Sequence, residues 1–86
     1  MENRDFTIVD VRTRAEYMAG HVAGSVNIPL QEIVERAEEL KQMKQPIIFC
    51  CASGNRSGQA TMYFKAEGVS CENGGSWLDV NYNLNK

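Results

Sequence analysis

Two short apolar runs constrain the fold of this chain more than any other feature. Residues 6–11 and 47–50 are rich in β-branched and aromatic side chains and contain few polar ones. Such runs are typical of strands that are covered on both faces, as the strands of parallel sheets are. One segment with helical spacing lies between them and another follows. The alternation predicts an α/β domain with a small, mainly parallel sheet, whose functional site lies at the carboxyl ends of its strands.

The shorter elements follow from local signals. Thr13 can cap a helix, because Glu16 stands three residues further on, as in a capping box. Apolar residues recur at helical spacing from Leu30 to Leu40, with charged residues between them. Together with Gly68 as a helix stop, these signals predict helices over residues 14–18, 30–40, 59–67 and 76–80, short strands over 25–28 and 69–71, and a turn over 73–75.

Length and charge limit the classes of function. The 86 residues suffice for one domain, residues 1–86. Nine basic and eleven acidic residues give a net charge of −2 without a cationic block, which argues against binding to nucleic acid or to an anionic membrane. No apolar run reaches the roughly 18 residues that span a bilayer, and the polar start is unlike a secretory signal. We expect a monomer in the cytoplasm, or in the periplasm if a signal peptide has been removed.

Three cysteines and one histidine limit the chemistry. An odd number of cysteines in no framework spacing argues against a disulfide-stapled fold. One histidine without a Cys-x-x-Cys pair leaves too few ligands for zinc, so we expect no metal and no cofactor. The cysteine count therefore points to a free reactive thiol.

The segment Cys50–Ser57 is the best candidate for the place of that thiol. It follows the apolar run at 47–50 and precedes a helical segment. The N–H groups of such a loop and the helix N-terminus together form a partly positive cup that favours an anion. A thiol held there has a lowered pKa and is nucleophilic near neutral pH. Two adjacent cysteines compete for this position.

Four ordered blocks resemble the single-domain rhodaneses, or thiosulfate sulfurtransferases, over nearly the whole chain. The blocks are residues 8–12, residues 16–29, the loop Cys51–Ser57, and residues 74–77. Within this family the chain is similar to the small phage-shock-protein-E type. The resemblance implies a rhodanese-like three-layer α/β/α fold and a sulfurtransferase whose cysteine carries a persulfide. Ala52 departs from the family pattern, because this position is often basic in members that use thiosulfate.

The two cysteines give two readings of the loop. Four residues separate Cys51 from Arg56, the loop length of sulfur-transferring rhodaneses. Five separate Cys50 from Arg56, as in the Cys-x5-Arg signature of cysteine phosphatases and arsenate reductases. We favour Cys51, because the apolar run continues through Cys50, which is then a buried core residue. A rhodanese-like module that docks a partner protein with little turnover is a third reading.

The resemblance also implies a mechanism. Cys51 would attack the sulfane sulfur of a donor such as thiosulfate, and an acceptor such as cyanide, a small thiol or a protein thiol would then remove that sulfur. The amides of residues 52–56 and the helix dipole would stabilise the persulfide anion. The residues expected to bind the substrate are Ala52, Ser53, Gly54, Asn55, Arg56 and Ser57.

Several of these residues also have structural roles open to them. Arg56 either holds the donor or braces the loop through backbone carbonyls or Asp10, and Ser57 either contacts the donor or serves the start of the helix. Gly54 is expected to adopt a positive φ. We expect Asp10 and Arg12 to form a structural ion pair beneath the loop, and Cys71 to be a packing residue.

Overall fold

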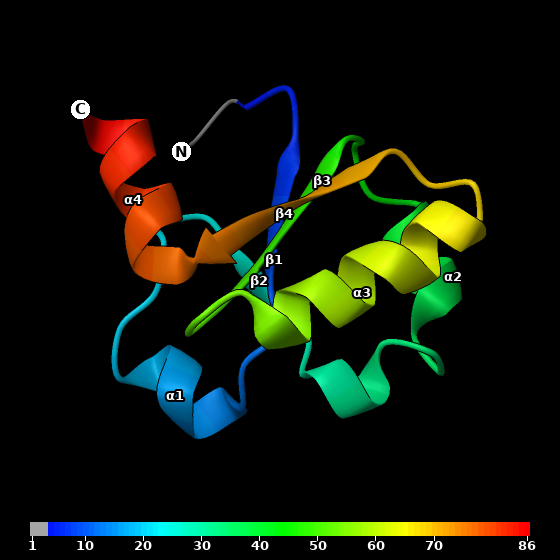
Figure 1. The fold of residues 1–86 in the computed structure, drawn as a ribbon, viewed down its shortest axis with the longest axis horizontal. Coiled ribbons are helices and arrows are strands. Elements are labelled where there is room, and N and C mark those ends of the chain that lie inside the picture. Colours follow the sequence, from blue (N-terminus) through cyan, green and yellow to red (C-terminus); the bar gives the residue numbers. More distant parts are fainter. Residues whose placement is uncertain (1–3) are drawn as a thin grey trace.

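The structure, a computed structural model, describes residues 4–86 of the chain. The strands are β1 (Thr7–Asp10), β2 (Val26–Asn27), β3 (Ile47–Cys51) and β4 (Cys71–Ser76). The helices are α1 (Arg14–Met18), the 3-10 turn η1 (Leu30–Glu32), α2 (Ala37–Lys41), α3 (Asn55–Ala66) and α4 (Trp77–Asn85) (Figure 1).

The four strands form one parallel sheet in the order β2-β1-β3-β4. The two continuous apolar runs became its central strands, β1 and β3. Asp10 pairs with Cys50, so the carboxyl ends of β1 and β3 meet at the same end of the sheet. The parallel α/β prediction is confirmed, and the loop after β3 leaves from this end.

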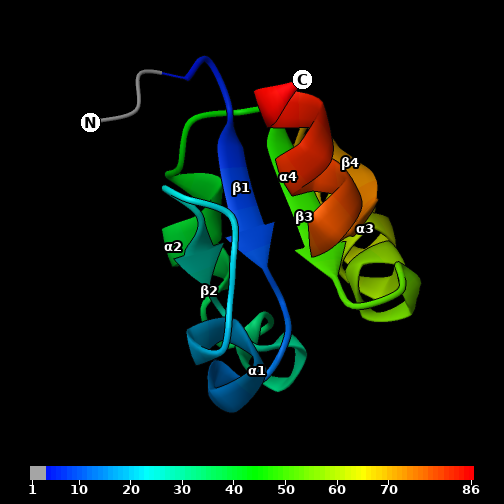
Figure 2. The ribbon, with the colours of Figure 1, turned by 90° about the vertical axis from the view of Figure 1, so that its left-hand side faces the viewer.

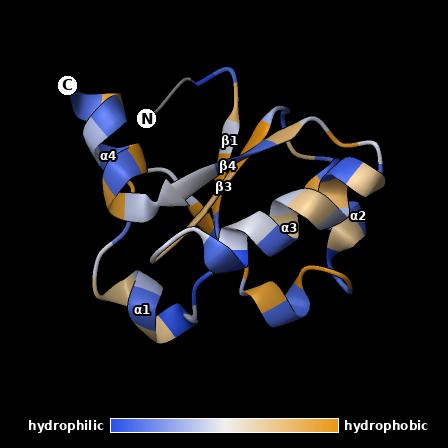
Figure 3. Ribbon diagram, in the orientation of Figure 1, coloured by the Kyte–Doolittle hydropathy of each residue, from blue (hydrophilic) through white to orange (hydrophobic). Residues whose placement is uncertain are grey.

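Helices cover both faces of the sheet. On one face α2 and α3 pack over β3, where Leu40, Phe49 and Phe64 form a buried core. On the other face α4 contributes Val80, which packs with Ile8. Figure 2 views the strands side by side, with α4 in front of β3. Figure 3 shows hydrophobic residues along β1 and β3 and hydrophilic residues on every helix. The predicted three-layer architecture is therefore confirmed.

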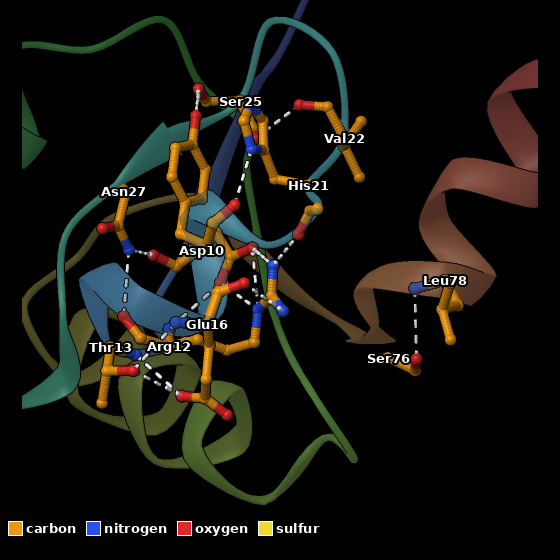
Figure 4. A network of polar contacts seen from close by, with 12 residues as sticks. Asp10, Arg12, Thr13, Glu16, His21, Val22, Ser25, Asn27, Ser76 and Leu78 are labelled. Atoms are coloured by element: carbon orange, nitrogen blue, oxygen red, sulfur yellow. Dashed lines mark hydrogen bonds and ion pairs between the residues drawn. The ribbon is translucent and has the colours of Figure 1, made fainter.

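The capping box predicted for α1 is present (Figure 4). The Glu16 N–H donates to Thr13 Oγ1 at 3.2 Å, and the Thr13 N–H donates to Glu16 Oε1 at 2.9 Å. Each side chain thus satisfies a backbone N–H that the short helix leaves without a partner. The box fixes Glu16 at the first turn of α1, which becomes important for the site.

The continuous helix predicted over residues 30–40 is wrong. The segment forms the single turn η1 and then, after a break, α2. Val34, predicted to face the core, is 62% exposed, whereas Leu40 is fully buried. Ile33 and Val34 lie in the break, and β-branched side chains such as these lose rotamer freedom in a helix. Two short elements that pack separately therefore replace one amphipathic helix.

The turn predicted from the sequence Asn-Gly-Gly is also wrong, because these residues lie within β4. Phe49 pairs with Asn73 but Cys50 pairs with Gly75, so Gly74 is an extra residue in β4, as in a β-bulge. Pairing with β3 has overridden a strong local turn signal. The strand predicted over residues 69–71 accordingly lies later, and the final helix extends well beyond residue 80.

Gly74→Ala is expected to destabilise the fold by about 1–3 kcal/mol. The added methyl carbon would lie 2.8 Å from Val80 Cγ2 and 2.9 Å from Ile48 Cγ2, closer than carbon atoms pack. Urea unfolding followed by the fluorescence of Trp77 measures the loss. Val80→Ala removes one of the overlapping methyl groups, so the double variant should be more stable than the sum of the two single changes implies. Additive effects would contradict a steric cause.

Candidate active site

The alternation of side chains along β3 separates two cysteines that are neighbours in the sequence. Successive side chains of a strand point to opposite faces. Cys50 packs with Val22 and Val80 on the α4 face, whereas Cys51 belongs to the core on the α3 face. Both thiols are free and neither side chain is exposed. Cys50 is thus the core residue that the apolar pattern predicted.

The Sγ atom of Cys51 is surrounded by hydrogen-bond donors. The Gly54 N–H donates to it at 2.9 Å and the Ser57 N–H at 3.5 Å, and the Ser57 hydroxyl oxygen lies 3.3 Å away. Gly54 precedes α3 with a φ of +108°, which confirms the positive φ predicted for it. These contacts place the sulfur at the N-terminus of α3, where the helix dipole favours a negative charge.

This environment makes Cys51 easier to ionise than an ordinary cysteine. Burial alone raises the pKa of the Cys51 thiol. The hydroxyl and the N–H of Ser57, followed by the N–H groups of Gly54 and Ser53, lower that pKa by more, so the net pKa lies below its ordinary value. The sulfur therefore combines full burial with a stabilised anionic form.

The pKa values of the other two thiols are shifted in the opposite direction, upwards. Burial, followed by the nearby negative charge of Asp10, raises the pKa of Cys50 to about 12. Burial also raises the pKa of Cys71, which lies in β4 with its sulfur 3.5 Å from the Thr61 carbonyl oxygen. Both remain neutral thiols near neutral pH, and their positions in the two cores fit packing roles.

The predicted substrate-binding loop is divided between exposed and buried residues. Ala52, Ser53 and Asn55 are exposed, Gly54 and Arg56 are half-buried, and Ser57 is buried. α3 begins at Asn55, four residues earlier than predicted, so Arg56 and Ser57 lie in its first turn. Ser57 faces Cys51 from there, while the exposed residues form the outer surface of the loop.

Arg56 has a partner that the sequence did not suggest. Its guanidinium forms two bonds to the Glu16 carboxylate, with Nη1 2.7 Å from Oε1 and Nη2 3.0 Å from Oε2. The braces predicted for Arg56 were backbone carbonyls or Asp10, and that prediction is wrong. The pair, together with the Thr13 cap, lowers the pKa of Glu16 to about 2. Glu16 therefore ties α1 to the first turn of α3.

The predicted ion pair beneath the loop is present and buried (Figure 4). Arg12 Nη2 lies 2.8 Å from Asp10 Oδ2 and 2.7 Å from the carbonyl oxygen of Gly20. The guanidinium also stacks 4.8 Å from the centre of the Trp77 ring. These contacts hold together β1, the segment after α1 and the start of α4, so Arg12 is a structural residue.

Asn73 of β4 is a second residue that sequence reasoning missed. The Ser57 hydroxyl donates to Asn73 Oδ1 at 2.7 Å, and Asn73 Nδ2 donates to the Gly54 carbonyl oxygen at 3.1 Å. The side chain thus contacts both residues that bond the Cys51 sulfur. The Asn-Gly-Gly sequence concealed this role, because it favoured a turn over a strand position.

Other features of the described residues lie apart from this thiol. A shallow surface hollow lined in part by Phe6, Thr7 and Lys44 lies at the amino end of β1, the opposite end of the strand from Asp10. Residues 4–86 contain no group of three or more His, Cys, Asp or Glu side chains placed to bind a metal ion. Among the same residues, no helix has the length and hydropathy of a bilayer-spanning segment.

Known proteins resemble this chain in sequence and in fold. Thiosulfate sulfurtransferase PspE of Escherichia coli is 35% identical over 74 residues, covering 84% of this chain and 71% of PspE. The putative sulfur carrier protein YrkF of Bacillus subtilis is 39% identical over 66 residues, covering 77% of this chain and 35% of YrkF. A solved structure of a rhodanese with anions from Escherichia coli has a TM-score of 0.78 at 34% identity, covering 86% of this chain and 89% of that one.

Several relatives are longer than this chain. The chain spans 22%, 35% and 52% of three bacterial proteins that it matches, the first of them the HTH-type transcriptional regulator Rv0324 of Mycobacterium tuberculosis. The rhodanese-like domain matches residues 1–79, which include the Cys51 loop and β4. This match and the identity to PspE show that the chain belongs to the rhodanese-like domain family.

Proposed function

We propose that residues 1–86 act as a single rhodanese domain that transfers a sulfane sulfur through a persulfide on Cys51. The observation that carries the proposal is the group of hydrogen-bond donors that Gly54 and Ser57 place around Cys51 Sγ. These donors lower the pKa of the Cys51 thiol. The N–H groups of Gly54 and Ser57 would also face a polarizable anion bound to Cys51. The similarity to proteins named thiosulfate sulfurtransferase and sulfur carrier protein supports the same chemistry.

The reaction has two displacements at sulfur. The Cys51 thiolate attacks the outer sulfur of thiosulfate, a new S–S bond forms, the S–S bond of thiosulfate breaks, and sulfite leaves with the electron pair. A thiolate or cyanide then attacks the outer sulfur of the persulfide and leaves with it, and Cys51 returns as a thiolate. Small-molecule donors and acceptors fit this scheme, as does a protein thiol as acceptor.

The geometry favours Cys51 over Cys50 as the nucleophile. A Cys-x5-Arg phosphatase would need Cys50 and Arg56 to face one bound phosphate. Cys50 instead lies in the core beneath α4 and keeps its proton, because its pKa is about 12. The loop amides bond the sulfur of Cys51.

Burial of Cys51 sets a requirement on the mechanism. No part of its side chain is exposed, while Ala52 and Ser53 of the adjoining loop are exposed. Donor sulfur therefore reaches Sγ only when part of the surrounding structure moves aside. Arg56 is held by Glu16 at its side of the loop, so we propose that Arg56 braces the loop and that the donor enters past residues 52 and 53.

Incubation with thiosulfate should add one sulfur atom to the wild-type protein, as measured by intact-mass spectrometry. The adduct should persist in Cys50→Ala and disappear in Cys51→Ala, because only Cys51 has a stabilised thiolate. Cyanide should remove the added mass and release thiocyanate. Cys71→Ala is a further control and should retain the adduct.

Two outcomes would refute this assignment. Loss of the adduct in Cys50→Ala but not in Cys51→Ala would make Cys50 the nucleophile. Absence of both adduct and turnover in the folded wild-type protein, with thiosulfate and with an organic persulfide as donors, would favour a docking module.

Glu16→Gln should lower the free energy of unfolding at pH 7 by about 0.5–1 kcal/mol, because it removes a solvent-screened ion pair while Gln keeps the cap. The folded-state pKa of Glu16, about 2, lies below its ordinary value of 4.5. Its stabilisation is therefore complete above pH 4.5 and is lost as the pH falls towards 2. The difference in stability between wild type and Glu16→Gln should shrink across that window in urea titrations.

Glu39→Gln provides the matched control for this prediction. Glu39 forms its ion pair with Arg36, on α2 and away from the loop. Glu16→Gln should change the rate at which iodoacetamide alkylates Cys51, because it removes the ion pair with Arg56 that braces the loop. Glu39→Gln should leave this rate unchanged. Equal alkylation rates in all three proteins would show that the Arg56–Glu16 pair does not brace the loop.

A further inference from the structure

The orientation of the Asn73 side chain is fixed by three hydrogen bonds. Oδ1 accepts from the Ser57 hydroxyl at 2.7 Å and from the Gly75 N–H at 2.9 Å. Nδ2 donates to the Gly54 carbonyl oxygen at 3.1 Å. If the amide were flipped, Nδ2 would face the N–H of Gly75 and Oδ1 would face the carbonyl oxygen of Gly54, so neither hydrogen bond could form. The oxygen that faces Ser57 is therefore an acceptor with no proton to give.

The Ser57 hydroxyl has a single proton and two acceptors beside it. When Cys51 is a neutral thiol, the S–H can donate to Ser57 Oγ at 3.3 Å while the hydroxyl donates to Asn73. When Cys51 is a thiolate, the sulfur can only accept, so the hydroxyl can bond the sulfur only by turning away from Asn73. Asn73 Oδ1 then keeps only the bond from the Gly75 N–H.

We propose that Asn73 is a positioning residue of the Cys51 site, which acts by competing with the Cys51 sulfur for the hydroxyl proton of Ser57. The bulge at Gly74 helps to position Asn73. It lets the Gly75 N–H donate to Asn73 Oδ1 while the residues on either side of Gly74 stay paired with β3. Gly58 leaves room for the amide, since a Cβ there would lie 3.3 Å from Asn73 Nδ2.

The competition has a role in sulfur transfer, in the part of the inference that rests on the proposed function. Uptake of a sulfane sulfur moves the negative charge from Sγ to the outer sulfur of the persulfide. Sγ is then a weak acceptor, and the Ser57 hydroxyl returns to Asn73. Asn73 thereby favours the persulfide state over the free thiolate. It also prevents the thiolate from becoming so stable that it reacts slowly as a nucleophile.

The test compares two variants of similar shape, Asn73→Leu and Asn73→Asp. Both lose the bond to the Gly54 carbonyl, so that loss is matched between them. Leu removes the competing acceptor and should lower the pKa of Cys51 by about 0.5–1, the worth of one hydrogen bond. Asp strengthens the acceptor and adds a negative charge, so it should raise that pKa. The pH dependence of iodoacetamide alkylation, located at Cys51 by mass spectrometry, gives each value.

The same change in a Ser57→Ala background separates competition from a general effect on the loop. Without the hydroxyl there is nothing to compete for, so Asn73→Leu should leave the pKa of Cys51 unchanged in that background. A purely structural role for Asn73 would shift the pKa equally with and without the hydroxyl. Urea unfolding of each variant checks that the comparison is made between folded proteins.

Either of two results would overturn the proposal. One is a Cys51 pKa in Asn73→Leu that equals or exceeds that of the wild type. The other is an equal decrease in the wild-type and Ser57→Ala backgrounds. These measurements use no sulfur donor, so a protein that fails to form a persulfide can still confirm the role of Asn73, and the converse also holds.

Discussion

A β-strand turns successive side chains to opposite faces, and this constraint organises the whole site. On β3 it sends Cys50 beneath α4 and Cys51 towards α3. Both side chains are fully buried, so burial cannot distinguish them. The difference comes from the donors that only the α3 face supplies, which lower the pKa of one thiol while that of its neighbour rises to about 12. The face of the strand, not exposure, therefore decides whether the pKa of a thiol on β3 is raised or lowered.

The loop over Cys51 is held by elements that lie far from it in the sequence. Glu16 reaches Arg56 from α1 across 40 positions, and Asn73 reaches Ser57 from β4 across 16. Glu16 is itself fixed by the capping box, and Asn73 by its pairing position beside the bulge. The loop and the first turn of α3, which supply the donors around the sulfur, are therefore held by residues of α1 and β4 as well.

Periodic and local signals predicted the parts of the structure that depend on short stretches of chain. The apolar runs gave β1 and β3, and the spacing from Thr13 to Glu16 gave the start of α1. The apolar pattern also predicted Cys50 as a core residue, which the structure confirms, whereas the choice of Cys51 as the nucleophile stays a prediction. The partners of Arg56 and Ser57 could not be predicted, because pattern carries no information on pairs brought together by the sheet. Glu16 also had a sufficient local explanation as a cap, which concealed its second partner.

The position of Asn73 in the last strand has a consequence for how the protein matures. As the chain is synthesised, the cysteine loop and α3 are complete before β4 exists. Until β4 docks at the edge of the sheet, the Ser57 hydroxyl and the Gly54 carbonyl lack Asn73 as their partner. The hydrogen bonds around the Cys51 loop are therefore complete only after the last strand has joined the sheet. The surroundings of this thiol thus differ between a nascent chain and the finished fold.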